Sequence, residues 1–236
     1  MVRSSFTSLE DAFAHCRGLD APLGERLELF AQISRRLRPE AQEAVDRMVE
    51  RLEASGAGTG APLPGQPMPS FSLPDETGHL VSLQDLLQKG PVAITFHRGH
   101  WCPYCRINTR VLAEVQEQIF SEGASIVAIT PERQIFGARL KLDAGLRYPV
   151  LTDVDNGYAF SIGLAILVGA EIEDVMRKTG RNLPEYQGND SWVLPIPATF
   201  VVGQNGRVVA RFIDPDYRHR MAVEDLLEAV HQAKSA

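Results

Sequence analysis

The fold is decided by residues 96–106, which read FHRGHWCPYCR. This stretch overlaps the end of an apolar run, Val92–Phe96, whose β-branched residues predict a strand. A pattern of helical periodicity follows it from Pro103 to Ser121. Cys102 therefore falls at or next to the N-cap of the helix. Pro103 takes the first helical position, where the missing N–H of a proline costs nothing.

The two cysteines of this stretch form a Cys-x-x-Cys pair about one helical turn apart. A thiolate at a helix N-terminus is stabilised by the helix dipole and by free backbone N–H groups, which lower its pKa from ~8.5 toward neutrality or below. We therefore predict that Cys102 is the attacking sulfur. Cys105, which points more toward the interior, would resolve the mixed disulfide. No cofactor is needed, because the two sulfurs store the electrons.

The same residues allow a metal site, made by His97, His100, Cys102 and Cys105. Structural zinc usually draws its ligands from two separated knuckles, and the sequence has no second Cys-x-x-Cys pair. The pattern therefore favours redox chemistry, and we expect no metal.

The neighbours of the cysteines bear on two further alternatives. An inert, buried pair of cysteines is one, but Trp101, Pro103 and Tyr104 are a poor match for a featureless core segment. Arg98 either adds positive charge near the thiolate or makes a surface ion pair, and the surface ion pair is the more common role. Trp101, Pro103, Tyr104 and Arg98 are therefore candidate supporting residues.

Composition excludes several classes of protein. The chain has 236 residues and a formal net charge of −6, so it lacks the basic surface that binding to nucleic acid requires. Acidic residues interrupt the first 19 residues before a signal peptide could form, and no stretch approaches the ~18 apolar residues of a membrane span. Three cysteines are too few for a framework of structural disulfides, and Cys16 is expected to be a packing thiol. We expect a cytoplasmic protein without a membrane partner.

Two parts of different texture are separated by a Gly- and Pro-rich stretch. We predict an N-terminal helical extension over residues 1–57, with two helices between Ser8 and Ala54, then a linker over 58–69 and a thioredoxin-like domain over 70–236. Strands and helices alternate in the last part, which implies βαβ units. The predicted elements after the Cys-x-x-Cys helix are Ser125–Thr130, a helix near Ile135–Leu146, Val150–Leu151, an irregular stretch Val168–Leu194, a hairpin of Thr199–Val202 and Val208–Ile213 that turns at Asn205-Gly206, and a helix Met221–Lys234.

A proline lies directly before the late strand, in the stretch Ile196-Pro197-Ala198-Thr199. Proline is tolerated at the first residue of a strand, and X-Pro is the bond that most readily adopts the cis form. We expect a cis bond before Pro197, with an ordinary trans bond as the alternative.

Together these features resemble the thioredoxin superfamily, with Cys-x-x-Cys at a strand-to-helix turn and Pro197 in the loop that faces it. The tetrapeptide Cys-Pro-Tyr-Cys is similar to that of glutaredoxins, whereas residues 65–220 resemble the AhpC/TSA branch, the bacterial peroxiredoxin-like proteins that carry Cys-x-x-Cys. The resemblance implies a central mixed sheet flanked by helices. The matching pieces are Pro69–Asp75 with Gly78, Val81–Leu83, Gly90-Pro91, the FHRGHWCPYC block, Ala128–Pro131, Pro149–Asp153, Leu194–Val202, and Asp216-Tyr217 with Arg220.

The chain departs from the family at three markers. Peroxiredoxins carry Pro-x-x-x-Thr-x-x-Cys, but if Cys105 is aligned with their cysteine, Arg98 and Cys102 replace the proline and the threonine. The arginine that precedes the late strand in peroxiredoxins falls at about Pro197. The buried acid of thioredoxins falls at Phe96, so the base for the resolving step is unidentified. Glu132 is a weak candidate for it, and a solvated loop carboxylate is its more usual role.

The sequence therefore predicts an oxidoreductase that exchanges disulfides, with thioredoxin, glutaredoxin or glutathione as the reducing partner. The first alternative is a thiol-dependent peroxidase that reduces hydroperoxides through a sulfenic acid. The second is a non-catalytic redox sensor that docks partners on its N-terminal helices. The oligomeric state is left open between a monomer and a homodimer.

Overall fold

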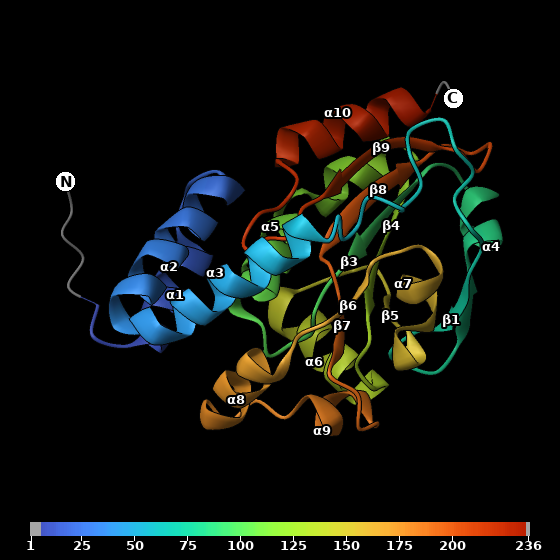
Figure 1. Ribbon diagram of the computed structural model, residues 1–236. Helices are drawn as coiled ribbons and strands as arrows, with labels where there is room; N and C mark the ends of the chain where they lie inside the picture. The colour runs from blue at the N-terminus through green and yellow to red at the C-terminus, as the bar shows by residue number, and fades with distance from the viewer. Residues whose placement is uncertain (1–5, 235–236) are drawn as a thin grey trace.

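The computed structural model describes residues 6–234, and its centre is a mixed five-stranded sheet (Figure 1). The strand order is β5-β4-β3-β8-β9. Strands β3, β4 and β5 run parallel, whereas β8 is antiparallel to both of its neighbours. The bounds are β3 Val92–Phe96, β4 Ser125–Thr130, β5 Val150–Thr152, β8 Ala198–Val202 and β9 Val208–Ile213. This arrangement is the thioredoxin-like fold that the sequence predicts.

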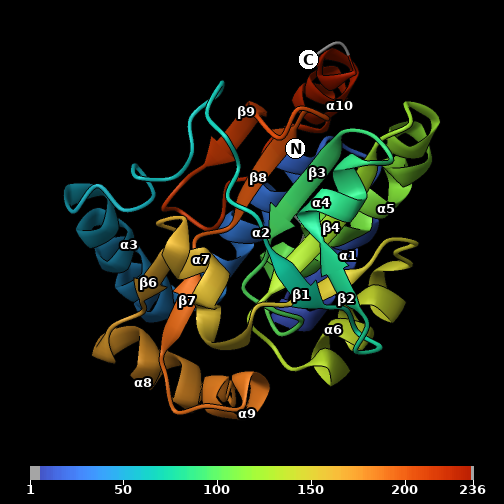
Figure 2. The same ribbon diagram turned by 90° about the vertical axis from the view of Figure 1, so that its right-hand side faces the viewer.

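Side chains of the central strands alternate between two hydrophobic cores, as the two-residue period of a strand requires. Ile94 and Phe200 face one core, which is covered by the hairpin β1 (Ser72–Pro74) and β2 (Leu80–Ser82), by α4 (Leu83–Leu87) and by α7 (Gly157–Ser161). Ala93 and Val201 face the other core, which is covered by α5 (Pro103–Ser121), α6 (Gln134–Ala144) and α10 (Val223–Ala233). Figure 2 shows β1, β2 and α4 on the first face.

The sequence predictions for the central elements are confirmed. Strands β3, β4 and β9 and helix α5 have the predicted bounds, and α6, β5, β8 and α10 differ from theirs by at most two residues at either end. The β8–β9 hairpin turns through residues 203–206, where the N–H of Gly206 donates to the carbonyl of Gly203 at 2.8 Å.

The N-terminal part holds three helices, whereas two were predicted. They are α1 (Leu9–Gly18), α2 (Leu23–Leu37) and α3 (Pro39–Ala54). Pro22 is the N-cap residue of α2, and Pro39 takes the first position of α3 directly after α2 ends, so a proline marks the start of each helix. The helices stand at one side of the sheet in Figure 1, where α1 and α2 pack against α5. Residues 1–5 of the predicted extension and 235–236 of the predicted domain lie outside the described residues.

Residues 58–69 lie against strand β9 and the core. The N–H groups of Gly65 and Met68 donate to the carbonyls of Val208 and Gly206, at 2.7 and 2.9 Å. Ala61 and Met68 are buried in the first core. The predicted linker is therefore packed along the sheet edge, although the division of the chain at this segment stays a prediction.

The stretch Val168–Leu194 is not irregular as predicted. It contains α8 (Ala170–Lys178) and α9 (Leu183–Gln187) and leads into β7 (Val193–Pro195), which pairs with β6 (Ala165–Leu167). A short helix η1 (Val154–Asn156) precedes α7. Helix α8 buries Ile172 and Met176, which are one turn apart, and this pattern is too short to be distinguished from a loop by periodicity.

The cis bond expected before Pro197 is wrong, because residues 6–234 contain no cis peptide bond. Pro197 joins β7 to β8 through a trans bond. A proline before a strand is compatible with both forms, since the trans form is favoured by only ~0.5–1 kcal/mol. Within the same residues, no helix is both long and apolar enough to span a membrane.

Candidate active site

Both cysteines of the pair are buried at the start of α5. Cys102 is the N-cap residue, its N–H donates to the carbonyl of Gly99 at 3.2 Å, and Pro103 is at the first helical position, as predicted. The exposed fraction is 1% for Cys102 and 0% for Cys105. Both thiols are free. The end of β3 and the first turn of α5 therefore present two sulfurs at the C-terminal edge of the parallel strands.

The environment separates the pKa values of the two thiols. Burial raises the pKa of Cys102, but this effect is outweighed by the Cys105 thiol, the charges of Arg98 and Arg220 and the Cys105 backbone N–H. The net result is a pKa lowered to about 6. Burial raises the pKa of Cys105 to about 12, and the neighbouring Cys102 adds to this rise. At neutral pH the pair therefore holds one thiolate, on Cys102, and one thiol, on Cys105.

Arg98 is a buried residue of the site, not the surface ion-pairing residue that was the more common expectation. Its side chain is 5% exposed. The guanidinium carbon lies 3.8 Å from the ring centroid of Tyr217 and 5.2 Å from that of Trp101. Two aromatic rings thus hold a positive charge beside Cys102.

Two N–H groups approach the sulfur of Cys105. The backbone N–H of Arg98 donates to Sγ at 3.4 Å, and Nη2 of Arg220 donates to it at 3.6 Å. These donors favour negative charge on Cys105 when its thiol ionises.

A hydrogen-bond chain fixes the tautomer of the buried His97. The hydroxyl of Thr95 donates to the carbonyl of Val127 at 3.1 Å, so its single proton is used. It must therefore accept from Nε2 of His97, at 2.9 Å. In the neutral form of the imidazole this leaves Nδ1 without a proton, and Nδ1 has no hydrogen-bond partner within residues 6–234. The ring is close enough to Cys105 to lower the pKa of that thiol, against the larger effect of burial.

Glu132 is fully buried, which corrects the expectation of a solvated loop carboxylate. Its two oxygens accept from the backbone N–H of His100 and contact Nδ1 of the same residue, both at 2.7 Å. Burial raises the pKa of Glu132, although His100 opposes the rise. Gly99 allows this approach, because a Cβ there would lie 2.5 Å from Cδ of Glu132 and its φ of +141° disfavours other residues.

The remaining predicted site residues divide into two groups. Trp101, Pro103 and Tyr104 line a cavity at Cys102, with Tyr104 packed edge-on against Phe30 of α2 at a centroid distance of 5.1 Å. Pro197 is not among the residues that line this cavity. Cys16 is buried in α1 and its burial raises its pKa to about 11, as suits a packing thiol.

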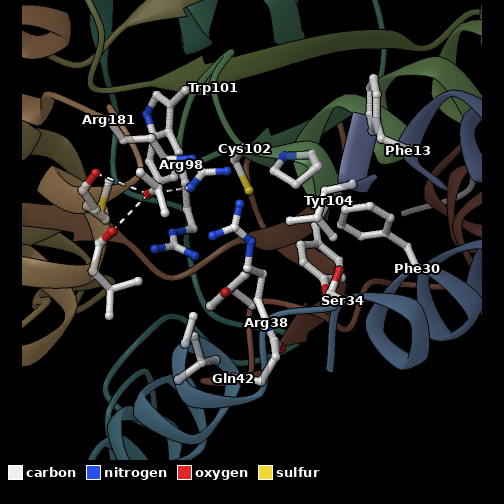
Figure 3. A pocket seen from close by; sticks show the side chains of 18 of the residues that line it. Phe13, Phe30, Ser34, Arg38, Gln42, Arg98, Trp101, Cys102, Tyr104 and Arg181 are labelled. Atoms are coloured by element: carbon white, nitrogen blue, oxygen red, sulfur yellow. Dashed lines mark hydrogen bonds between the residues drawn. The ribbon is translucent and has the colours of Figure 1, made fainter. Parts of the chain in front are cut away.

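The cavity has a volume of about 660 Å³ and lies between the N-terminal helices, the start of α5 and helix α8 (Figure 3). Cys102 is one of its lining residues, and Cys105 is not. Helices α1 and α2 share a hydrophobic core with Cys102 and Cys105, which includes Phe30 and Leu27, whereas α3 packs in a core with α8. Their apolar faces are therefore used within the chain, which disfavours the docking role that the sensor hypothesis gave them.

Several residues of the site were not predicted as such. From the sequence, His97 is expected only as a metal ligand in one alternative, and Tyr217 and Arg220 belong to the family resemblance without an assigned role. A signal for the last two existed in their placement within a matching motif. Within residues 6–234, no three His, Cys, Asp or Glu side chains gather as metal ligands would, so the four residues of the metal alternative do not form a ligand set.

A sequence model of the AhpC/TSA family matches residues 64–211, which is more than half of the chain. The chain belongs to the AhpC/TSA family. The match includes both cysteines and ends before Tyr217 and Arg220, whereas helices α1–α3 precede it. The family assignment therefore covers the dithiol pair but not the walls that the N-terminal helices add.

Relatives in this family are distant. Thiol-disulfide oxidoreductase ResA of Bacillus subtilis is 27% identical over 146 residues, which are 61% of this chain and 64% of the relative's length. The putative peroxiredoxin Rv2521 of Mycobacterium tuberculosis is 25% identical over 149 residues, 62% of this chain and 82% of the relative. Both relatives support an oxidoreductase of the thiol-disulfide or peroxiredoxin type.

Solved structures agree on the fold. Peroxidoxin BcpB of Mycobacterium tuberculosis superposes with a TM-score of 0.56 and 20% identity, covering 72% of this chain and 97% of its own. Reduced Prx3 of Vibrio vulnificus, in complex with hydrogen peroxide, gives a TM-score of 0.56 and 13% identity, covering 71% and 98%. At these identities the likeness establishes the thioredoxin-like fold alone.

Proposed function

We propose that this protein is a dithiol–disulfide oxidoreductase in which Cys102 attacks and Cys105 resolves. The observation that carries the proposal is the separation of the two pKa values, to about 6 for Cys102 and about 12 for Cys105. A dithiol enzyme needs one sulfur that is a thiolate before the substrate arrives and one that stays protonated until the first step is complete.

In the first step, the Cys102 thiolate attacks one sulfur of a disulfide RSSR. The Cys102–SR bond forms, the S–S bond breaks, and RS⁻ leaves. The positive charges of Arg98 and Arg220 stabilise the negative charge that is shared along the three sulfurs.

In the second step, His97 acts as the base for Cys105. Its unprotonated Nδ1 takes the proton of the Cys105 thiol, and the thiolate attacks Sγ of Cys102. The Cys102–SR bond breaks, and the leaving RS⁻ takes up the proton, so the two steps together give RS⁻, RSH and an internal disulfide. Glu132 is less suited to this role, because both of its oxygens are engaged with His100.

A thiol-dependent peroxidase is the second candidate, favoured by the arginines at the pair. Peroxiredoxins polarise the peroxide with a guanidinium, and the usual position of that arginine is Pro197 in this chain. Arg98 and Arg220 bring guanidinium charge to the sulfurs from other elements. In this reaction Cys102 would become a sulfenic acid, and Cys105 would condense with it and release water.

Stopped-flow tryptophan fluorescence of the fully reduced protein separates the two candidates, with Trp101 beside Cys102 as the reporter. The protein is mixed with 2-hydroxyethyl disulfide and, separately, with hydrogen peroxide. We expect rapid oxidation by the disulfide and slow oxidation by the peroxide. The opposite order would make the protein a peroxidase, and no reaction with either would favour the sensor. Cys102→Ser should abolish both signals, whereas Cys105→Ser should accumulate the mixed disulfide.

The role of His97 is tested by His97→Gln, which removes the basic nitrogen. We expect the mixed disulfide at Cys102 to form at the wild-type rate and to be released about 10²-fold more slowly, the usual loss when a general base is removed. Mass spectrometry of quenched samples follows both species. His231→Gln, at an exposed histidine of α10, is the matched control. Release at the wild-type rate in His97→Gln would exclude the histidine as the base.

We further propose a cytoplasmic location and a reducing partner of the thioredoxin, glutaredoxin or glutathione type. Free, buried cysteines at 16, 102 and 105 are compatible with a reducing compartment.

A further inference from the structure

The cavity beside Cys102 carries a marked excess of positive charge. Five cationic side chains and a single acidic one, Glu10, line it. Of the cations, Arg106 pairs with Asp143, and Lys178 pairs with Asp174. The other three are Arg38, Arg98 and Arg181.

No carboxylate within residues 6–234 pairs with Arg38, Arg98 or Arg181. Arg98 is held by aromatic rings, and Arg181 donates to the hydroxyl of Thr179 at 2.8 Å. Figure 3 shows the three side chains converging on the space next to the sulfur of Cys102. They come from the loop before α3, the end of β3 and the turn after α8. Like charges brought together from three elements repel one another, so this arrangement is stable when an anion lies between them.

The cavity also offers neutral polar groups. Gln42 of α3 is 9% exposed, and its Oε1 accepts no hydrogen bond from residues 6–234. Nε1 of Trp101 is likewise a buried donor without a partner in that range. Phe13, Phe30 and Val45 supply apolar wall between these groups. The cavity is therefore suited to a ligand with carboxylates, an amide or amine N–H, and a short apolar part.

Access to Cys102 limits the size of its partner. The residue is 1% exposed, and its sulfur faces a cavity that is walled by α1, α2, α3 and α8. A disulfide on the surface of a folded protein would have to displace these helices, of which α1 and α2 share a hydrophobic core with the cysteines and α3 and α8 pack together in a neighbouring core. A small molecule can reach the sulfur without any such change, so of the reducing partners proposed above, access favours the glutathione type over thioredoxin and glutaredoxin.

We propose that this cavity binds a low-molecular-weight thiol and its disulfide that carry several carboxylates, as peptide thiols do. The inference rests on the proposed function, because the ligand is the RSSR of the exchange reaction. One molecule of reduced enzyme, with Cys102 as the thiolate and Cys105 as the thiol, and one of RSSR give RS⁻, RSH and the Cys102–Cys105 disulfide, and the reverse reaction regenerates the reduced pair. Arg38 and Arg181 hold the carboxylates, while Arg98 stabilises the sulfur that leaves.

The test compares three small disulfides of different charge against the reduced protein: oxidised glutathione, which is anionic, 2-hydroxyethyl disulfide, which is neutral, and cystamine, which is cationic. We expect the second-order rate constant to fall in that order. Arg38→Ala and Arg181→Ala should each lower the ratio of the glutathione rate to the cystamine rate about tenfold, the loss of one charge-assisted hydrogen bond. Arg139→Ala removes an exposed charge of α6 that does not line the cavity, and it should leave the ratio unchanged.

The outcomes separate the two proposals. If none of the three disulfides oxidises the protein, the oxidoreductase function itself fails. If all three react at rates that do not depend on charge, or if the ratio resists both arginine substitutions, the exchange function stands and the anionic site is refuted. Faster oxidation of the reduced protein by insulin, whose disulfides are those of a folded protein, than by oxidised glutathione would overturn the inference in favour of a protein partner.

Discussion

A hydrogen bond from the Cys105 thiol stabilises the thiolate of Cys102, and its contribution can be measured with a matched pair of variants. Cys105→Ala removes the donor, whereas Cys105→Ser keeps a hydroxyl in the same place. The Cys105 thiol is the largest of the influences that lower the pKa of Cys102 to about 6. The wild-type residue is therefore about nine-tenths thiolate at pH 7.

The expected magnitude follows from the strength of a hydrogen bond to a charged group, about 1.5–3 kcal/mol. Loss of that bond raises the pKa of Cys102 by about 1–2 units, since each unit corresponds to about 1.4 kcal/mol. The thiolate fraction at pH 7 in Cys105→Ala then falls to between about a half and a tenth. In Cys105→Ser the pKa should stay within about half a unit of the wild-type value, because a hydroxyl donates at least as well as a thiol.

Absorbance at 240 nm, followed from pH 4 to 9, reports the thiolate, and the rate of alkylation by iodoacetamide checks it. Cys16 does not interfere, because burial raises its pKa to about 11. Circular dichroism shows whether each variant is folded over this range. Equal pKa values of Cys102 in the two variants would refute the reasoning, since the bond would then not be what stabilises the thiolate.

Three other outcomes follow from the structure. Between pH 6 and 9, Cys102 holds a proton in the unfolded protein and has lost it in the folded one. The free energy of unfolding of the reduced protein should therefore rise by about 1.4 kcal/mol per pH unit relative to that of Cys102→Ser. Urea unfolding at pH 5, 7 and 9 measures this rise. Gly99→Ala places a Cβ 2.6 Å from Nε1 of Trp101 and should lower the free energy of unfolding by about 1–3 kcal/mol. A Cβ in Gly18→Ala meets nothing within 4 Å and should change that free energy by less than about 0.5 kcal/mol. Equal effects of the two substitutions in thermal unfolding would contradict this reasoning. Phe30→Ala leaves a cavity in the core that contains Cys102 and should lower the free energy of unfolding by about 3–5 kcal/mol, as measured in urea. Phe160→Ala, at a side chain that is 77% exposed, should lower it little. An equally small loss in both variants would mean that the N-terminal helices are not part of the core.

The central sheet and the dithiol could be predicted from sequence because their signals are local. The alternation of Val92–Phe96 and of Ser125–Thr130 depends on the faces of one strand, and the position of Cys102 depends on its immediate neighbours. The short helices α8 and α9 escaped because each has few buried residues. Ile172 and Met176 are buried against α3 and the segment around Leu183, which are distant in sequence.

The electrostatics of the site could not be predicted in the same way. Glu132 follows β4 by two residues and Arg98 follows β3 by two, and both side chains are buried. A charged residue after a strand is usually solvated, so the common role was the reasonable expectation for both. Contacts with distant parts of the chain remove that solvent: Glu132 lies against Gly99 and His100 of the loop before α5, and Arg98 lies over the ring of Tyr217.

The burial of Cys102 affects both the ionisation of its thiol and the binding of a ligand beside it, and the nearby arginines act on both. Burial alone favours the protonated thiol, so a buried nucleophile needs compensating positive charge, and Arg98 and Arg220 supply it. The same charge attracts an anionic ligand, which would weaken the thiolate if it stayed beside it. Attack on the ligand's sulfur removes the charge from Cys102, and the cations can then interact fully with the carboxylates of the mixed disulfide. A cationic cavity at a buried cysteine therefore favours the step from bound anionic disulfide to mixed disulfide, and this argues that the helices that bury Cys102 belong to its chemistry.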